Sequence, residues 1–270
     1  MLRILSALNG TLLLRRAAVG VVGLAVALAS AGCKDTVDAA PDSGADYYPV
    51  AVGRFWIYAV ADTTWSTATQ FNQSVPTATS YQFREQITGQ MTDAAGKPAY
   101  RVLRSIRATP TDAWRDDSVF VLSARPQFVA LNRNNSPTVE LVFPVREGRS
   151  WNFNAFNNDL NDTITAETRR YSAVGNAFST GGGRSGLPVI TYPATVTTDN
   201  TGTATETSLL KRVSYQQVYA KGVGPVFRRR LNFAFFNYPD PSQNGNQVYP
   251  ANSYFSAFSR QETLLEYGPK

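Results

Sequence analysis

Beyond residue 46 the apolar residues alternate with a period of two, and this feature restricts the chain to a fold built from β-strands. In the segment SYQFREQITGQM (residues 80–91), Tyr81, Phe83 and Ile87 fall on one side of an extended chain, and polar residues fall on the other. This alternation is typical of a strand that is buried on one face. No segment beyond residue 46 carries a long apolar stripe of helical period.

Turn-forming residues separate the expected strands at short intervals. Asp93–Pro98 and Asn134–Pro137 are turns between strands, Gly181–Gly186 is a glycine-rich link, and two long strands bend at Gly222 and Gly224. The last segment, residues 256–268, fits a final strand or a short helix. We therefore predict an all-β domain with a single antiparallel meander of about 10–12 strands that forms a curved half-barrel, a barrel or a sandwich.

The only cysteine, Cys33, follows a segment that resembles a bacterial secretory leader. Residues 1–32 contain three arginines, an apolar stretch too short to span a bilayer comfortably, and small residues before the cysteine. These small residues resemble a lipobox, which implies cleavage before Cys33 and lipid attachment to its sulfur. A free or intermolecularly paired thiol, and a buried cysteine in an uncleaved helix, are the alternatives.

Residues 33–46 are short, acidic and without apolar periodicity, so we expect a flexible tether before a globular domain at residues 47–270. Lys34 directly after the cysteine favours the outer membrane, with the protein lipid-anchored and facing either the periplasm or the cell surface. Removing the leader lowers the net charge from +6 to +3, because the leader holds three arginines and no acid. A charge of this size predicts no nucleic-acid partner.

The chain contains no histidine, which excludes Ser-His-Asp and Cys-His catalysis and histidine-bound metals. An enzyme of this composition would need carboxylates, Lys, Tyr, Ser, Thr or calcium. The acidic residues show no carboxylate pair at the spacing for glycoside hydrolysis, because neighbouring residues such as Asp116 and Asp117 point to opposite faces of a strand. We expect a monomer with no enzymatic activity, no cofactor and no metal.

Three blocks together resemble uncharacterised outer-membrane lipoproteins of Bacteroidetes type: YYPVAVGRFWIYAV (residues 47–60), LVFPVREGRSWNFNAF (141–156) and VYAKGVGPVFR (218–228). The resemblance implies the location and the type of fold. It implies no activity and no catalytic residue. The aromatic residues of the first block could form a platform for sugar or lipid, but a strand that is apolar on both faces is more often central, so we expect Trp56 and Tyr58 in the core.

Two sequence segments contain possible ligand-binding residues. Trp151, Asn152 and Asn154 combine an aromatic ring with amides that could bind sugar hydroxyls, although asparagines also form turns. The neighbouring residues 157–162 carry oxygen ligands at a spacing that calcium could use, but they lack the glycine and terminal glutamate of an EF-hand.

Arg229 lies in a strand pattern on the same side as several aromatic residues, so we expect it on the apolar side, where it must reach a partner or a rim. Arg228 and Arg230 are expected on the opposite, solvated side. Tyr238, Tyr249 and Tyr254 line a proline-stiffened segment that we predict to be a long loop, used either for recognition or to cover an open barrel end.

From these observations we predict a non-enzymatic envelope lipoprotein, anchored to the membrane through Cys33. Its β domain would bind an amphipathic or glycan ligand or support an envelope assembly. A carboxylate-dependent glycan hydrolase of the cell envelope is the alternative. A dry apolar cavity would favour a lipid carrier, a filled core with an exposed Tyr/Asn loop would favour recognition, and two converging carboxylates would favour the hydrolase.

Overall fold

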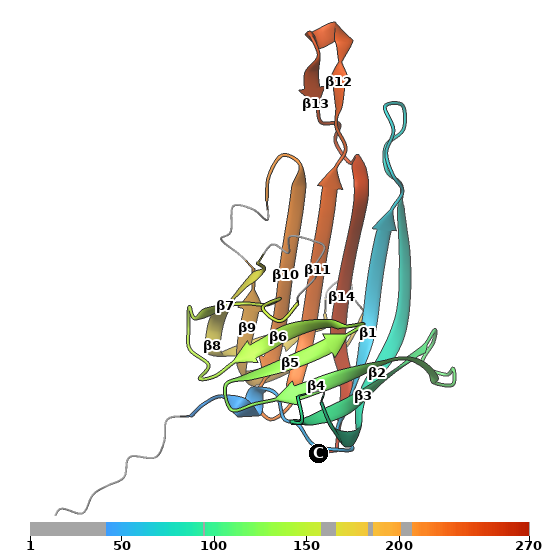
Figure 1. Ribbon diagram of the computed structural model, residues 1–270. Coiled ribbons are helices and arrows are strands. Elements are labelled where there is room, and N and C mark those ends of the chain that lie inside the picture. The colour runs from blue at the N-terminus through green and yellow to red at the C-terminus, as the bar shows by residue number, and fades with distance from the viewer. Residues whose placement is uncertain (1–41, 94, 158–165, 183–185, 201–206, 270) are drawn as a thin grey trace, which may run out of the picture. The chain divides into compact units, whose positions relative to one another are not determined.

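A computed structural model describes residues 42–93, 95–157, 166–182, 186–200 and 207–269 (Figure 1). The predicted leader, Cys33 and most of the possible calcium-binding segment lie outside these residues. None of the described residues belongs to a helix that is long and apolar enough to cross a membrane.

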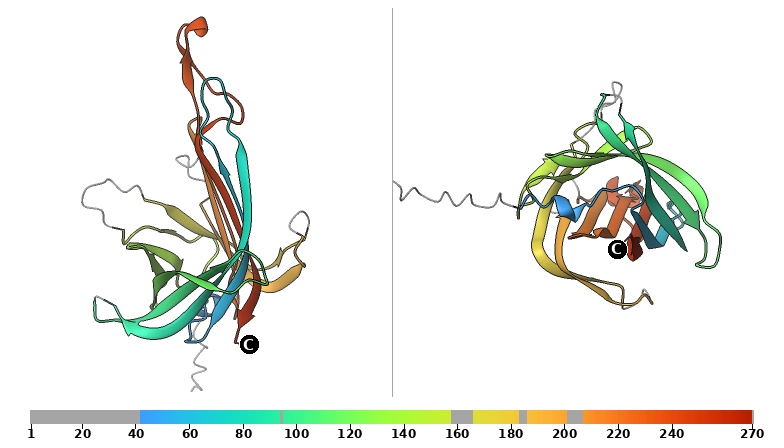
Figure 2. Two further views of the ribbon diagram at one scale, coloured as in Figure 1. Left: turned by 90° about the vertical axis from the view of Figure 1, so that its right-hand side faces the viewer. Right: turned by 90° about the horizontal axis from the view of Figure 1, so that it is seen from below.

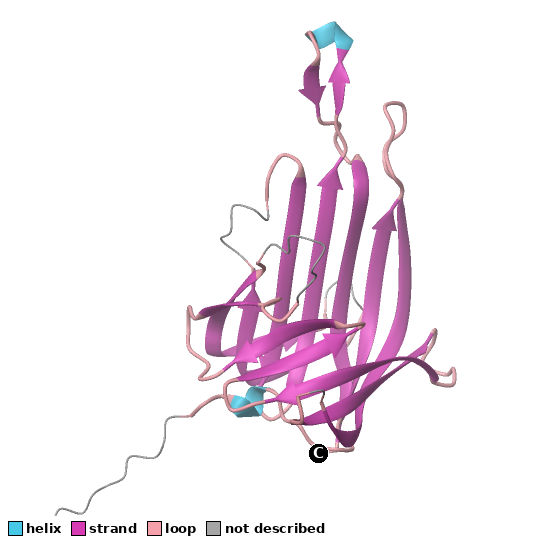
Figure 3. Ribbon diagram, in the orientation of Figure 1, coloured by secondary structure: helices cyan, strands magenta, loops and turns pink. Residues whose placement is uncertain are grey.

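The described chain is almost entirely β-structure, as predicted (Figure 3). Twelve of its strands form one antiparallel sheet, and the other two, β12 and β13, form a separate hairpin. The strands are β1 (Phe55–Trp65), β2 (Pro76–Thr92), β3 (Pro98–Arg107), β4 (Arg115–Ala124), β5 (Phe128–Arg133), β6 (Ser136–Val142), β7 (Ser150–Asn152), β8 (Thr168–Thr180), β9 (Ile190–Asp199), β10 (Lys211–Ala220), β11 (Gly224–Phe235), β12 (Tyr238–Asp240), β13 (Asn246–Val248) and β14 (Tyr254–Gly268).

The sheet order is β6-β5-β4-β3-β2-β1-β14-β11-β10-β9-β8-β7. Two meanders therefore flank β14, the last strand of the chain, which pairs with β1 on one side and β11 on the other. The sheet curls until its two edges approach each other (Figure 2). Val139 N–H in β6 donates to the carbonyl of Phe153, just after β7, at 2.7 Å, and the sheet is thereby nearly closed into a barrel.

The hairpins follow the turn chemistry of the sequence. Asp93 Oδ1 accepts from the backbone of Ala95 and Lys97, which fixes the β2–β3 turn. Asn134 and Asn135 adopt positive φ angles in the β5–β6 turn, a conformation that asparagine tolerates. The long loop predicted over residues 235–255 is wrong in part, because this segment contains the β12–β13 hairpin, which extends from the end of the sheet (Figure 1).

The concave face of the curled sheet encloses the core. Trp56 and Tyr58 are buried there, as expected, and each donates a side-chain hydrogen bond across the sheet to a backbone carbonyl near the start of β11. Their face also carries Phe83, Leu122 and Val226. The core is thus filled by aromatic and aliphatic side chains, together with the charged groups described below.

The domain begins before the predicted boundary at residue 47. Lys221 Nζ lies 2.6 Å from a carboxylate oxygen of Asp42 and 3.5 Å from one of Asp46. The backbone N–H of Gly222 donates to the Asp46 carbonyl at 2.8 Å, next to a short 3-10 helix, η1 (Ala45–Tyr47). Residues 42–46, predicted as the end of the tether, therefore pack on the turn between β10 and β11.

Gly224 allows Trp56 to approach the β10–β11 turn closely. Its φ is +106°, and a Cβ at this position would lie 2.9 Å from Trp56 Nε1. Gly222 also has a positive φ, +74°, but a Cβ there would meet nothing within 4 Å. We expect Gly224→Ala to lower the free energy of unfolding by about 1–3 kcal/mol more than Gly222→Ala, because only the former adds overpacking to backbone strain. Urea unfolding of the two variants tests this, and equal losses would contradict the close approach.

Candidate functional site

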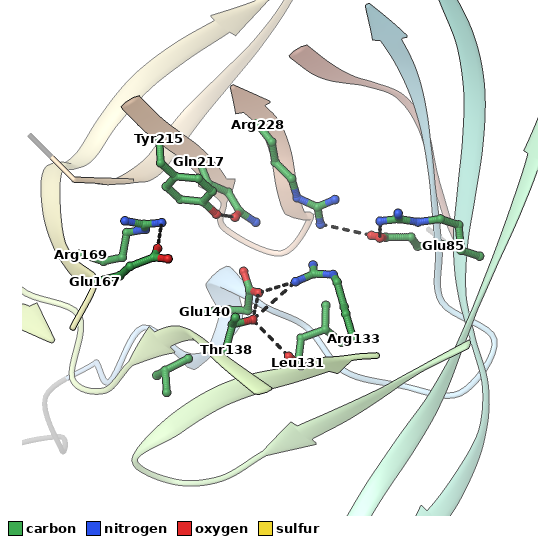
Figure 4. Close-up of polar contacts among 12 residues, drawn as sticks. Glu85, Leu131, Arg133, Thr138, Glu140, Glu167, Arg169, Tyr215, Gln217 and Arg228 are labelled. Atoms are coloured by element: carbon green, nitrogen blue, oxygen red, sulfur yellow. Dashed lines mark hydrogen bonds and ion pairs between the residues drawn. The ribbon is translucent and has the colours of Figure 1, made fainter. Parts of the chain in front are cut away.

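Charged side chains from opposite sides of the sheet meet inside it (Figure 4). Arg228 on β11 is only 1% exposed and contacts Glu262 on β14 at 3.0 Å and Glu85 on β2 at 3.1 Å. Arg104 on β3 contacts the other oxygen of Glu85 at 2.6 Å. Because buried charges are costly unless paired, this arrangement ties four strands together through its ion pairs.

A second ion pair extends the network toward β5 and β6. Arg133 Nη1 lies 3.0 Å from Glu140 Oε1, and Thr138 Oγ1 donates to the same oxygen at 2.9 Å. Tyr219 from β10 donates to Glu140 Oε2 at 3.2 Å across the interior. The network is therefore neutral in sum, with three arginines and three glutamates, namely Arg104, Arg133, Arg228, Glu85, Glu140 and Glu262.

The three glutamates are held in their ionised form. Burial alone would raise the pKa of Glu85, but the charges of Arg228 and Arg104 hold that pKa well below its ordinary value. The pKa values of Glu140 and Glu262 are also lowered, since nearby arginines outweigh the effect of burial. General-acid catalysis needs the opposite shift, so these three glutamates are not poised as general acids.

A pocket of about 310 Å³ opens beside this network. Its cationic side chains are Arg133, Arg169 and Arg230. Its wall also contains three aromatic rings, apolar residues and small polar groups, namely Phe153, Tyr215, Phe258, Val213, Leu231, Ser136, Thr138, Ser214 and Asn232. We call this site the arginine pocket. Its volume lies at the lower end of the range for small-molecule sites, about 300–1,000 Å³.

Arg169 is held rigidly in the wall of the arginine pocket. Its guanidinium lies over the rings of Tyr215 and Phe153, with its central carbon 4.1 and 4.4 Å from the ring centres. One nitrogen contacts Glu167 at 2.9 Å, and Glu167 is the only carboxylate among the described residues that line this pocket. Tyr215 in turn donates to Gln217. The stacking and the ion pair fix the direction of the Arg169 nitrogens.

Arg230 supplies a positive charge without a counter-ion in contact. No described residue forms a salt bridge or a side-chain hydrogen bond with its guanidinium, and its Nε is buried without a partner. The Nε atoms of Arg133 and Arg169 are likewise buried and unpaired. Because Arg133 and Arg169 each have a glutamate, the described residues leave the arginine pocket with one excess positive charge, which a bound anion would neutralise.

The asparagine-rich segment lies next to this pocket, but its predicted residues are used structurally. Trp151 donates to the carbonyl of Val139 at 2.8 Å and packs against Tyr171, at the seam between β6 and β7. Asn152 accepts from the backbone of Asn154 at 3.2 Å, and Asn154 accepts from that of Glu167 at 3.0 Å. These contacts support the turn interpretation, and none of the three residues lines the arginine pocket.

The expected surroundings of the arginines in β11 are wrong. Arg229 is exposed on the outer face, whereas Arg228 is buried and Arg230 lines the pocket. The alternation itself was predicted, but the aromatic residues that share a side with Arg229 do not mark the enclosed core. Phe227 is partly buried and packs against Phe178, 5.5 Å between ring centres.

The three predicted tyrosines do not form one site. Tyr238 lies in the β12–β13 hairpin and contacts Phe236, while Tyr249 is exposed after β13. Tyr254 begins β14 and packs among Trp65, Phe233 and Phe235. Tyr254 therefore anchors the base of the hairpin, and Tyr249 is the only exposed residue of the three, at 39%.

A comparison with models of known protein families gave no match, and comparisons with curated proteins and with solved structures gave no significant match. The residues of the arginine pocket were not identified from the sequence. Their only signal is that arginines occupy alternate positions of predicted strands, which also describes a solvated face.

Proposed function

We propose that residues 42–270 form the ligand-binding module of a lipid-anchored envelope protein, and that the arginine pocket takes a small amphipathic anion. The observation that carries this proposal is Arg230, a cation without a contacting counter-ion in a pocket with aromatic walls. The leader and Cys33 support an outer-membrane location on the basis of sequence. A carboxylate or phosphate would pair with Arg230, and an apolar body would contact Phe258 and Leu231.

The same geometry favours binding over the alternative of glycan hydrolysis. Two catalytic carboxylates would have to face one cleft, yet Glu167 is the only described carboxylate in the arginine pocket, and it is paired with Arg169. An uncharged glycan would leave Arg230 without a counter-ion. The filled interior also differs from the dry apolar cavity that an acyl-chain carrier would need.

Binding of 4-phenylbutyrate, measured by isothermal titration calorimetry, tests this proposal against its uncharged match, 4-phenylbutan-1-ol. We expect the acid to bind and Arg230→Gln to weaken it roughly 10–150-fold, the range for loss of a charge-assisted hydrogen bond. Arg229→Gln, one residue away on the outer face, should leave binding unchanged. Equal binding of acid and alcohol, or equal effects of the two substitutions, would refute an anion site at Arg230.

A further inference from the structure

The end of the sheet opposite the β10–β11 turn exposes large apolar side chains. Phe71 in the β1–β2 loop is 88% exposed, Leu209 before β10 is 75% exposed, and Val75, Leu210 and Phe255 are exposed as well. We call these five the distal apolar residues. None of these five residues lines the arginine pocket.

Backbone and side-chain contacts place the distal apolar residues at the ends of neighbouring strands. Phe235 N–H donates to the Leu210 carbonyl at 2.8 Å, which joins the ends of β10 and β11. The rings of Phe236 and Phe255 lie 5.0 Å apart, which joins β11 to β14. Thr67 Oγ1 donates to the Phe255 carbonyl at 3.1 Å, which connects β14 with the β1–β2 loop. The segments that carry the apolar groups are therefore neighbours along one end of the sheet, where Figure 1 shows the ends of β10, β11 and β14 and the β1–β2 loop in a row.

An aromatic cluster behind this row holds the strand ends together. Trp65 lies 5.2 Å from Phe233 and 6.0 Å from Tyr254, measured between ring centres, and Tyr254 lies 5.8 Å from Phe235. These rings come from three consecutive strands of the sheet, β1, β14 and β11. The exposed residues thus project from an ordered base, and the protein's own packing leaves them outside its core.

Two exposed positive charges lie beside the row. Lys211 and Arg212 are exposed at the start of β10, directly after Leu209 and Leu210. Asp240 in the β12–β13 hairpin is only half-buried, but its carboxylate accepts from the backbone and hydroxyl of Ser242. Exposed Phe and Leu beside Lys and Arg are typical of segments that enter the interface of an anionic membrane.

We propose that the distal end of the sheet binds the surface of an anionic lipid bilayer. Phe71, Leu209 and Phe255 enter the acyl region, and Lys211 and Arg212 contact lipid phosphates. A bilayer fits better than a second copy of the chain, because the apolar side chains come from the β1–β2 loop, the segment before β10 and the start of β14, not from one sheet face. Asp42, the first described residue, lies at the other end of the sheet beside Lys221.

Flotation with lipid vesicles tests the proposal, using residues 33–270 with Cys33→Ser so that no lipid is attached. We expect this protein to float with vesicles of phosphatidylethanolamine and phosphatidylglycerol and to bind pure phosphatidylcholine weakly. The triple variant Phe71→Ser, Leu209→Ser, Phe255→Ser should lose at least about tenfold in affinity. Reversing Lys211 and Arg212 to Glu should cost at least about fivefold per charge, on the anionic vesicles only.

Matched controls separate this surface from general stickiness. Val52→Ser, Val119→Ser, Val189→Ser removes three exposed apolar residues elsewhere, and Arg101→Glu, Arg115→Glu reverses two exposed charges on β3 and β4. Both controls should float like the parent, and circular dichroism should show that all variants are folded. Absence of flotation by the parent, or equal losses in the controls, overturns the proposal. A parent dimer that the triple variant converts to a monomer, without vesicle binding, would assign this end to a second copy and also overturn it.

Discussion

Replacing Arg228 by methionine should lower the free energy of unfolding by about 3–5 kcal/mol, the usual loss when one partner of a buried ion pair is removed. Arg228 is the only described residue that hydrogen-bonds to the side chain of Glu262, and it also contacts Glu85. Glu85 would keep Arg104, but Glu262 would remain buried without a contacting cation. Methionine retains much of the apolar volume, so the loss reports mainly the unpaired charge.

Urea unfolding of Arg228→Met and Arg229→Met at neutral pH measures this loss against a control one residue away. Arg229 is exposed, so its substitution should change stability by no more than about 0.5 kcal/mol. The difference between the variants should shrink in acid. Without Arg228, burial favours the neutral form of Glu262, so protonation removes the unpaired charge. A loss below about 1 kcal/mol for Arg228→Met would show that the network is not sealed from water.

The strands and their turns could be predicted because both depend on local sequence. Alternation in residues 80–91 identifies β2, and Asp93–Pro98 identifies the turn to β3, since side-chain period and turn chemistry act within a few residues. The order of the strands could not be obtained in this way. The pairing of β14 with β1 joins segments far apart in the chain, and no local pattern specifies it.

The interior of the sheet was harder to assign because both faces of β11 carry apolar or aromatic neighbours. Phe227, Phe233 and Phe235 suggested an inward side, but they pack on the outer face against Phe178, Trp65 and Tyr254. The inward side instead carries Arg228, which the sequence alone presents as a surface residue. Its burial depends on Glu85 and Glu262, which come from other strands.

The candidate site was predicted less well than the fold for the same reason. The arginine pocket combines residues of β5, β8, β10 and β11, and the excess charge at Arg230 is visible only once its neighbours are known. The asparagine-rich segment drew attention by composition, yet Trp151 and Asn154 mainly close the seam and the turns. Composition therefore pointed to the sheet edge beside the arginine pocket but not to the residues that line the pocket.

Raising the pH above about 10 should unfold the domain cooperatively, because five of its buried tyrosines ionise less readily in the folded than in the unfolded chain. Burial raises the pKa of Tyr215 to about 12 and raises those of Tyr48, Tyr58, Tyr171 and Tyr219 further. The phenol of Tyr58 also donates to the carbonyl of Pro225 at 2.8 Å, so its ionised form would face an acceptor.

The sign follows from proton binding. Above the unfolded pKa of about 10 the unfolded chain loses these protons first, so the stability that is fully present below pH 10 falls as the pH rises toward the folded pKa values. Each tyrosine contributes about 1.4 kcal/mol per pH unit, and five together about 7 kcal/mol per pH unit. At this slope, the stability lost over roughly two pH units is comparable to the total stability of most domains, about 5–15 kcal/mol.

An alkaline titration followed by near-ultraviolet circular dichroism and by tyrosinate absorbance measures this effect. Loss of tertiary structure and ionisation of the buried tyrosines should coincide in one transition. Tyr58→Phe should make stability fall less steeply with pH, by about 1.4 kcal/mol per unit, whereas Tyr249→Phe, at an exposed position, should leave the slope unchanged. Ionisation of all tyrosines near pH 10 while the tertiary signal persists would show that water reaches these phenols, and that the concave face is not the sealed core on which the ion-pair network depends.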